Sequence, residues 1–223
     1  MTKEEYFGDW AKVIDTSELY KIMTWLKVVN KNTLCPDIKN IFKAFKLCPL
    51  TECVAVILSQ DPYPQKGVAT GITFGNNKEP LSPSLEVIKE GVIDYSIPHN
   101  HIDFDNTLES WSSQGILMIN SALTCSEGQV GSHASIWKPF MEKLIQNLSI
   151  YNTGLVWLLF GSQAQSFRKS IILSSKVLSC YHPAYYARKG TSMPEDIFKN
   201  FKKAIFDSSG KLINFYTEYS VED

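Results

Sequence analysis

Four short runs of apolar residues punctuate the chain, and each predicts a buried β-strand. They cover residues 53–58, 116–119, 155–160 and 176–180. Apolar runs that do not alternate with polar residues are typical of parallel strands covered on both faces. Glycine, serine and asparagine bound these runs, as expected where a strand gives way to a turn. The four runs therefore predict the core of one parallel sheet.

Segments with helical character separate the predicted strands, at residues 84–92, 137–148 and 162–173. The second segment carries an apolar stripe with helical spacing, at Phe140, Met141, Leu144, Ile145 and Leu148. Strands that alternate with helices form right-handed crossovers that place helices on both faces of the sheet. We therefore expect an α/β fold with a central four-stranded, mostly parallel sheet flanked by helices. In such folds a ligand binds beyond the carboxyl ends of the strands.

The length of 223 residues suits one well-buried α/β domain and is short for two. We expect a single domain over residues 1–223, with a mostly helical lead-in at 1–50 and a core at 51–190. Residues 191–223 should form a C-terminal helix and an acidic tail, with the part after Lys211 lying at the periphery.

Polar residues follow all four predicted strands. They provide Asp61 after the first strand, Asn120 after the second, a small hydroxyl loop at 161–162 and His182 after the fourth. Taken singly, each is an ordinary turn or core residue. Taken together, an acid, an amide, a hydroxyl and an imidazole at one edge of a sheet indicate an active site.

The charge distribution is uneven although the net charge is only −1. Residues 161–200 carry a net charge of +4, and the rest of the chain carries −5. The near-neutral total argues against a general nucleic-acid binder. The basic segment fits transient, salt-sensitive contact with a DNA backbone, although a chance fluctuation of the surface explains the charge equally well.

Several other functional classes find little support. The chain has neither a phosphate-binding Gly-x-x-x-x-Gly-Lys-Ser/Thr loop nor a Gly-x-Gly-x-x-Gly turn after the first strand. Its five cysteines form no Cys-x-x-Cys pair, so we expect reduced, mostly buried thiols. Cys180 lies two residues before His182, but its apolar strand favours an inert core thiol over a nucleophile. The histidines and aspartates at 98–105 could bind a metal, yet a polar surface loop explains them as well.

No stretch is long and apolar enough to span a bilayer, and residues 1–5 lack the apolar core of a signal peptide. We therefore expect no membrane association and an intracellular protein. The location would be cytoplasmic in a bacterial or viral setting, and the nucleus stays open.

Several motifs, in a fixed order, resemble those of family 1 uracil-DNA glycosylases. They are SQDPYP at 59–64, GITF at 71–74, PLSPSL at 80–85, QGILMINSALT at 114–124, GSH at 131–133, LFGSQAQ at 159–165 and HPAYY at 182–186. The resemblance covers about residues 50–190 and is specific because all the motifs occur with compatible spacing. It implies a glycosylase that flips uracil out of DNA and hydrolyses its N-glycosidic bond, leaving an abasic site.

The resemblance also implies roles for residues around the base. Asp61 would stabilise the sugar cation and position the attacking water. His182 and the backbone amides around Gln60 would hold the carbonyl oxygen on which negative charge develops. Asn120 would pair with the ring N–H and the adjacent carbonyl of uracil, a pattern that cytosine reverses.

Two aromatic residues would complete the base pocket by the same resemblance. Phe74 would stack on the base, and Tyr63 would clash with the methyl group of thymine. Without the flanking motifs, core packing would be the better explanation of both.

The rest of the implied site contacts DNA outside the pocket. Hydroxyls and main-chain groups would hold successive phosphates, at Ser82, Ser84, Ser162, Pro183 and Ala184. Tyr186 stands where the family commonly has a leucine that fills the gap left by the flipped base. We expect no metal and no cofactor, single- or double-stranded uracil-containing DNA as substrate, and a monomer. An inhibitor protein that imitates DNA is a further possible partner.

Three departures from the family pattern keep alternatives open. Ser59 and Pro64 replace the family's glycine and histidine, and residues 185–187 differ from its Pro-Leu-Ser. The missing histidine removes a hydrogen-bonding group near Asp61. A catalytically weak uracil-DNA-binding or processivity protein on the same fold is therefore the alternative to an enzyme. Excision of thymine is a third possibility, which Tyr63 disfavours.

Overall fold

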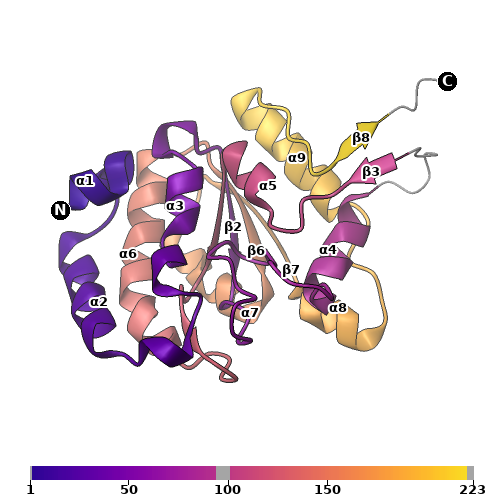
Figure 1. The fold of residues 1–223 in the computed structure, drawn as a ribbon. Helices are drawn as coiled ribbons and strands as arrows, with labels where there is room; N and C mark the ends of the chain where they lie inside the picture. The colour runs from indigo at the N-terminus through magenta and orange to yellow at the C-terminus, as the bar shows by residue number, and fades with distance from the viewer. Residues whose placement is uncertain (1, 94–100, 220–223) are drawn as a thin grey trace.

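A four-stranded parallel sheet forms the centre of the protein in a computed structural model that describes residues 2–93 and 101–219 (Figure 1). Its strands are β2 (Ala55–Ser59), β4 (Ile116–Asn120), β6 (Val156–Phe160) and β7 (Lys176–Cys180), in the order β4-β2-β6-β7. All pairings in this sheet are parallel, with Ser59 opposite Asn120 and Phe160 opposite Cys180. The predicted α/β fold and its four strands are confirmed.

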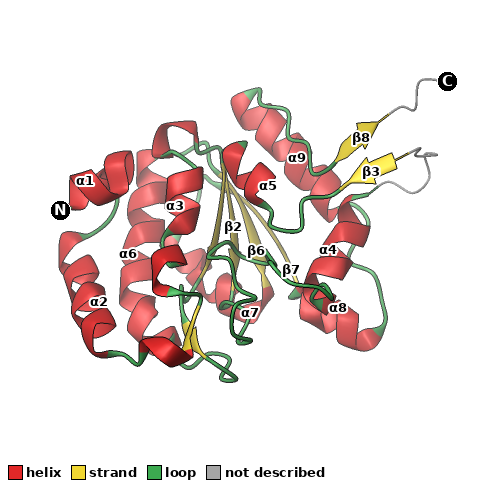
Figure 2. Cartoon of the chain, viewed as in Figure 1, coloured by secondary structure: helices red, strands yellow, loops and turns green. Residues whose placement is uncertain are grey.

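Alternate residues of the strands feed two separate hydrophobic clusters, one on each face of the sheet. Leu58 and Trp157 point into the first cluster, whereas Ile57 and Leu158 point into the second. Four helices cover the first face (Figures 1 and 2): α1 (Lys3–Phe7), α2 (Thr16–Val28), α3 (Lys43–Leu47) and α6 (Ala134–Tyr151). Four cover the second: α4 (Pro83–Val92), α5 (Glu109–Ser113), α8 (Pro183–Lys189) and α9 (Ile197–Ser209). This double cover is what buried parallel strands require.

Two of the three predicted connecting helices match α4 and α6, and the third is shorter than expected. Residues 162–173 were expected to be one helix, but α7 covers only Gly161–Gln165 and a 3-10 helix, η5, continues over Ser166–Ser170. Strand β7 is also less buried than predicted, since Lys176 and Ser179 are exposed. It lies at the edge of the sheet with β6 as its neighbour, so its polar residues can reach solvent.

Residues 1–50 are mostly helical, and they contain a strand that the sequence pattern does not reveal. Strand β1 (Leu34–Cys35) pairs antiparallel with β5 (Cys125–Ser126). Short 3-10 helices link the remaining parts: η1 (Gly8–Lys12), η2 (Lys31–Thr33), η3 (Ile38–Asn40) and η4 (Leu50–Glu52). A strand of two residues is too short to leave a periodic signal.

The expectation of a peripheral tail after Lys211 is wrong for much of that segment. Ile213 and Phe215 are buried, and the indole N–H of Trp111 donates a hydrogen bond to the Phe215 carbonyl oxygen at 2.9 Å. Strand β8 (Thr217–Tyr219) then pairs antiparallel with β3 (His101–Asp103). The tail therefore closes the second hydrophobic cluster.

The five cysteines are free thiols, and four of them are buried, as predicted. Within the described part of the chain, no helix is long and apolar enough to cross a membrane.

The packing of the tail predicts a stability difference between two neighbouring substitutions. Phe215→Ala should lower the free energy of unfolding by about 3–5 kcal/mol, because it removes a buried ring. Leu212→Ala should change it by less than about 0.5 kcal/mol, because Leu212 is 73% exposed. Urea unfolding of both variants measures the difference. Equal effects would mean that the tail does not pack as described.

Candidate active site

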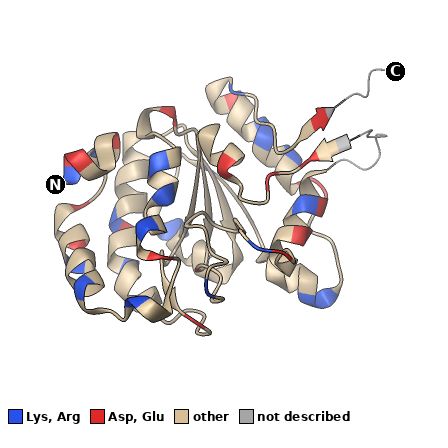
Figure 3. Cartoon of the chain, in the orientation of Figure 1, with Lys and Arg blue, Asp and Glu red and all other residues tan. Residues whose placement is uncertain are grey.

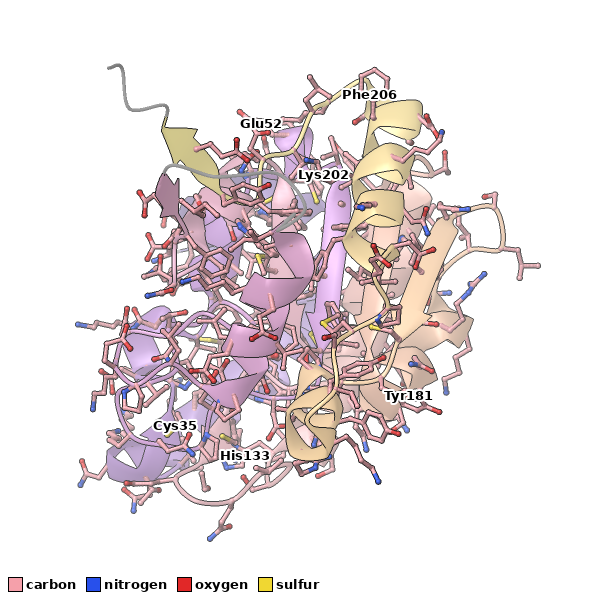
Figure 4. The ribbon with its side chains drawn as sticks, turned by 90° about the vertical axis from the view of Figure 1, so that its right-hand side faces the viewer. Cys35, Glu52, His133, Tyr181, Lys202 and Phe206 are labelled. Atoms are coloured by element: carbon pink, nitrogen blue, oxygen red, sulfur yellow. The ribbon has the colours of Figure 1, made fainter. Side chains whose placement is uncertain are left out.

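The segments that follow β2, β4 and β7 enclose a cavity of about 280 Å³, slightly below the usual range of ligand sites. It lies at the carboxyl ends of the strands, the edge where the predicted polar residues were expected to meet. Figure 4 shows His133 and Tyr181 at this end of the molecule, whereas Glu52 and Phe206 lie at the opposite end. Eight of the predicted site residues line the cavity: Gln60, Asp61, Tyr63, Phe74, Ser84, Asn120, His182 and Ala184.

Asp61 follows Gln60 in the turn after β2 and lies half-buried in the cavity wall. Pro62 after it favours an extended backbone at Asp61, which carries the side chain away from the strand. Its Oδ2 accepts a hydrogen bond from the backbone N–H of Gly131 at 2.6 Å. Burial raises the pKa of the Asp61 carboxyl above its ordinary value, and the hydrogen bond from Gly131 partly offsets this rise.

Asn120 ends β4 beside Ser59 and is almost fully buried. The hydroxyl of Thr73 donates a hydrogen bond to its Oδ1 at 2.6 Å. This bond fixes the amide so that the oxygen faces Thr73. The amide keeps further capacity to accept and to donate.

His182 combines a place in the cavity with a structural role as the N-cap of α8. Its Nδ1 accepts a hydrogen bond from the backbone N–H of Ala184 at 3.1 Å. Burial, together with the charge of Arg188, lowers the pKa of the imidazole to about 4. The ring is therefore neutral at pH 7, and its proton lies on Nε2 because Nδ1 is the acceptor.

A glycine allows His182 to approach the start of α7. Gly161 has a φ of +82°, and a Cβ atom at this position would lie 3.0 Å from the Cβ of His182. Any larger residue would be strained and would press on the Cβ and backbone of His182.

Phe74 and Tyr63 form the aromatic part of the cavity. Phe74 is buried and packs edge-on against Phe160, with ring centroids 5.4 Å apart. Its φ of +63° is rare for a bulky residue, and such strain clusters at functional sites. The Tyr63 hydroxyl donates to the Phe74 carbonyl oxygen at 3.0 Å and accepts a hydrogen bond from the Ser82 hydroxyl. Burial raises the pKa of Tyr63 to about 12, so the phenol stays neutral.

The loop after β4 holds the backbone of Gln60. The Gln60 carbonyl oxygen accepts hydrogen bonds from the hydroxyl of Ser121 at 2.8 Å and from the N–H of Ala122 at 3.0 Å. The loops that carry Asp61 and Asn120 are therefore fastened to each other.

The residues predicted to bind phosphate differ in how accessible their polar groups are. Ser162 is exposed at the start of α7, whereas Ser82 is the N-cap of α4 and its hydroxyl is hydrogen-bonded to Tyr63. Pro183 is buried and has no N–H, and the N–H of Ala184 already donates to His182. The backbone after His182 therefore offers fewer free donors than the sequence suggested.

Tyr186, expected to fill the gap left by a flipped base, is turned into the protein. It is only 7% exposed and belongs to the second hydrophobic cluster. The helix α8 directs this side chain toward the core and leaves Tyr185 37% exposed and Tyr181 63% exposed. A wedge at position 186 would have to leave the core first, which makes it a poor candidate.

The basic segment at 161–200 does not gather at the cavity. Arg188 lines the cavity and Lys189 is exposed nearby, but Lys176 begins β7 and therefore lies at the other end of the sheet. Lys169 forms an ion pair with Glu142 at 3.2 Å. Lysine and arginine occur on helices at both sides of the sheet (Figure 3). The basic segment identified in the sequence therefore contributes charge near the cavity through the end of α8.

Several residues of the cavity or its supports were not assigned a role by the sequence analysis. Val130 and Arg188 line the cavity, Gly131 binds Asp61, and Thr73 orients Asn120. Thr73 lies in the GITF motif and Gly131 in the GSH motif, and these motifs were the indication in the sequence that both residues belong to the site. Their partners are far along the chain, so spacing alone could not assign them.

Other chemistry at this edge is not supported by the described residues. Cys180 is half-buried, and desolvation raises its pKa to about 12, so it is a neutral thiol at pH 7 and a poor nucleophile. Among residues 2–93 and 101–219, no group of three potential metal ligands comes together. Part of the suggested metal-binding segment at 98–105 lies outside the described residues.

The chain is similar in sequence to known proteins. The sequence profile of the uracil DNA glycosylase superfamily matches residues 45–206. A uracil-DNA glycosylase of Buchnera aphidicola is 38% identical over 188 residues, covering 82% of this chain and 79% of the relative. A uracil-DNA glycosylase of Campylobacter jejuni is 37% identical over 174 residues, covering 74% of this chain and 73% of the relative.

Solved structures agree on the fold. The crystal structure of mimivirus uracil-DNA glycosylase has a TM-score of 0.70 and 22% identity, covering 96% of this chain and 93% of that one. A Y322L variant of the mimivirus enzyme in complex with UGI also has a TM-score of 0.70, with 20% identity and coverage of 96% and 92%. The profile match and the sequence relatives, at more than a third identity over most of both chains, show that this chain belongs to the uracil-DNA glycosylase superfamily.

Proposed function

We infer that this protein excises uracil from DNA by hydrolysing the N-glycosidic bond and leaves an abasic site, as the first step of base-excision repair. The observation that carries the inference is the meeting of Asp61, Asn120 and His182 in one cavity. These three groups match a sugar cation, the edge of a uracil ring and a developing oxyanion. Membership of the superfamily gives the same reaction.

Base recognition would depend on Asn120 and its support from Thr73. Because Thr73 donates to the Asn120 oxygen, that oxygen faces a fixed direction and its second lone pair can accept from uracil N3–H. The Asn120 NH₂ can donate to the neighbouring uracil carbonyl. Cytosine presents an unprotonated N3 beside an amino group, so both contacts would become repulsive.

Leaving-group stabilisation would come from the neutral imidazole of His182. The hydrogen bond from Ala184 to Nδ1 keeps the proton on Nε2, where it can be donated to the uracil carbonyl oxygen as negative charge builds up. The cap thus presets the tautomer before substrate arrives. No proton transfer is needed, since the departing base can leave as an anion held by this hydrogen bond.

Asp61 would act on the opposite side of the breaking bond. As the bond electrons move to uracil, the sugar gains positive charge, which a nearby carboxylate stabilises. The same carboxylate can orient the water whose oxygen bonds to the sugar carbon. Pro64 has no side-chain hydrogen-bond donor that could hold Asp61. The backbone N–H of Gly131 donates to the Asp61 carboxylate and holds it in place.

Contact with DNA outside the cavity would use the hydroxyl of Ser162 and the groove beside the cavity. Ser82, Ser84 and Ala184 line this groove, and Arg188 adds a charge. We propose that this surface also accepts an acidic protein that imitates DNA. The mimivirus protein that shares the fold was solved in complex with UGI. We further propose that the chain acts as a monomer, as one domain over residues 1–223, inside the cell.

The Asp61→Asn variant separates an enzyme from a binding protein. It should lower the single-turnover excision rate by a factor of about 10² or more, because the sugar cation loses its carboxylate. Binding of a uracil-containing oligonucleotide should change little. The midpoint temperature of thermal unfolding at pH 7 should not fall. Burial of the ionised Asp61 carboxyl is unfavourable, and asparagine avoids this desolvation while its side-chain oxygen can still accept the hydrogen bond from Gly131. Retention of full excision would contradict the role of Asp61.

Tyr63→Ala tests the exclusion of thymine. Removing the ring should open space beside the base and raise thymine excision from undetectable to measurable, whereas excision of uracil should fall only moderately. The readout is alkaline cleavage of labelled oligonucleotides that hold one uracil, thymine or cytosine, in EDTA. Tyr63→Phe is the matched control, since it keeps the ring and loses the bonds to Phe74 and Ser82. Absence of any thymine excision by Tyr63→Ala would contradict the proposal that the Tyr63 ring excludes the methyl group of thymine.

The pH dependence follows from the lowered pKa of His182. Because the folded imidazole titrates near pH 4 rather than 6.5, the excision rate should show no break near pH 6.5. It should fall only at lower pH, as His182 and Asp61 gain protons. Stability should decrease between pH 6.5 and 4, since the unfolded histidine binds a proton that the folded one does not. Single-turnover rates and urea unfolding across pH 4–8 test both; a rate that halves near pH 6.5 would contradict the neutral site.

A further inference from the structure

Two exposed tyrosines that are sequence neighbours of cavity residues have no place in the catalytic scheme above. Tyr181 lies between β7 and His182, and Tyr185 lies on the first turn of α8. Tyr181 is 63% exposed and Tyr185 is 37% exposed, and their ring centroids are 4.7 Å apart with planes inclined by 31°. Figure 4 shows Tyr181 at the outer surface of the molecule, at the active-site end.

The pair is held in place by the protein beneath it. The buried Tyr186 packs edge-on against Tyr185, with ring centroids 5.4 Å apart, and lies 6.4 Å from Tyr181. The His182 carbonyl oxygen accepts from the Tyr185 N–H at 2.8 Å, which anchors the backbone of the helix. Two exposed rings that stack on each other and pack on Tyr186 leave an outer ring face on which a ligand can stack at low entropic cost.

The position of this face, which we call the Tyr181–Tyr185 platform, suggests what it binds. Its tyrosines are sequence neighbours of His182 and Ala184, which both line the cavity. A nucleotide next to an extruded uracil would therefore be expected on this side of the cavity, near the platform. Arg188 and Lys189 on the same helix are exposed and add positive charge for a phosphate backbone.

We propose that the Tyr181–Tyr185 platform stacks the base next to the target uracil when the substrate is single-stranded DNA. Stacking on an aromatic face tolerates every base, so the platform adds affinity without sequence preference. In a single strand the neighbouring base is free to move onto the platform. In a duplex that base is already paired and stacked, and the buried Tyr186 cannot readily replace it or the flipped base.

The proposal rests on the proposed function, and its test is a double-mutant cycle between protein and DNA. The probe is a single-stranded oligonucleotide with one deoxyuridine that carries a 2′-fluorine to slow cleavage. In matched versions, the base on the 5′ or the 3′ side of the uracil is removed. Fluorescence anisotropy measures the binding of each version to the wild-type protein, Tyr181→Ala and Tyr185→Ala.

For the wild-type protein, loss of one of the two neighbouring bases should weaken binding about 5- to 100-fold. The same loss should leave the binding of either alanine variant nearly unchanged, because the platform is already gone. Tyr181→Phe, which keeps the ring, should behave as the wild-type protein. Tyr20→Ala on α2, on the other side of the sheet, is the matched control for an exposed tyrosine.

Steady-state kinetics on the unmodified oligonucleotide provides the second readout. The alanine variants should raise KM for single-stranded DNA by a similar factor, with kcat and the duplex activity little changed. Equal losses for all proteins on base removal, or unchanged KM, would overturn the proposal and favour a protein partner for the exposed tyrosines. The wild-type protein is assayed first. Absence of uracil excision by the wild-type protein would refute the proposed function. The binding measurements would still show whether the platform stacks the neighbouring base.

Discussion

Parallel pairing of β2 with its two neighbours is the interaction on which the site depends. The register places Ser59 beside Asn120 and Leu58 beside Leu159, so the three loops that follow these strands begin at the same height. Pairing of Phe160 with Cys180 adds the loop that carries His182. Because a parallel sheet needs cover on both faces, the helices take up the two faces and leave the strand ends open. The cavity is therefore a consequence of the sheet, and the loops supply its chemistry.

The carboxyl group and the imidazole of the cavity are both shifted toward their neutral forms. Burial raises the pKa of Asp61 and lowers that of His182. For His182 the neutral form is the one that can donate from Nε2 while it accepts from Ala184. For Asp61 the ionised form is the one that the proposed reaction needs, so the fold keeps a charged carboxylate in a place where burial disfavours the charge. Together with the strained backbone of Phe74, this is stability given up for function.

Much of this arrangement could be predicted from the sequence, and what could not shares a physical cause. Apolar runs mark the strands because burial on two faces leaves no polar positions, and the motifs mark Asp61, Asn120 and His182. Gly131 binds a carboxylate 70 positions earlier in the chain, and such a contact leaves no local pattern. The face of α8 that turns inward depends on what packs below it, so the burial of Tyr186 was not apparent from spacing. The docking of Phe215 on Trp111 was hidden for the same reason.

The capping bond between His182 and Ala184 has a consequence for how variation at this position can be interpreted. One imidazole both begins a helix and faces the substrate, so most replacements would disturb folding and chemistry together. Asparagine or serine could still cap the helix without the ring donor, whereas alanine would lose both roles. Natural drift at position 182 is thereby restricted by two independent requirements. An inactive variant there cannot be assigned to catalysis until its helix is known to be intact.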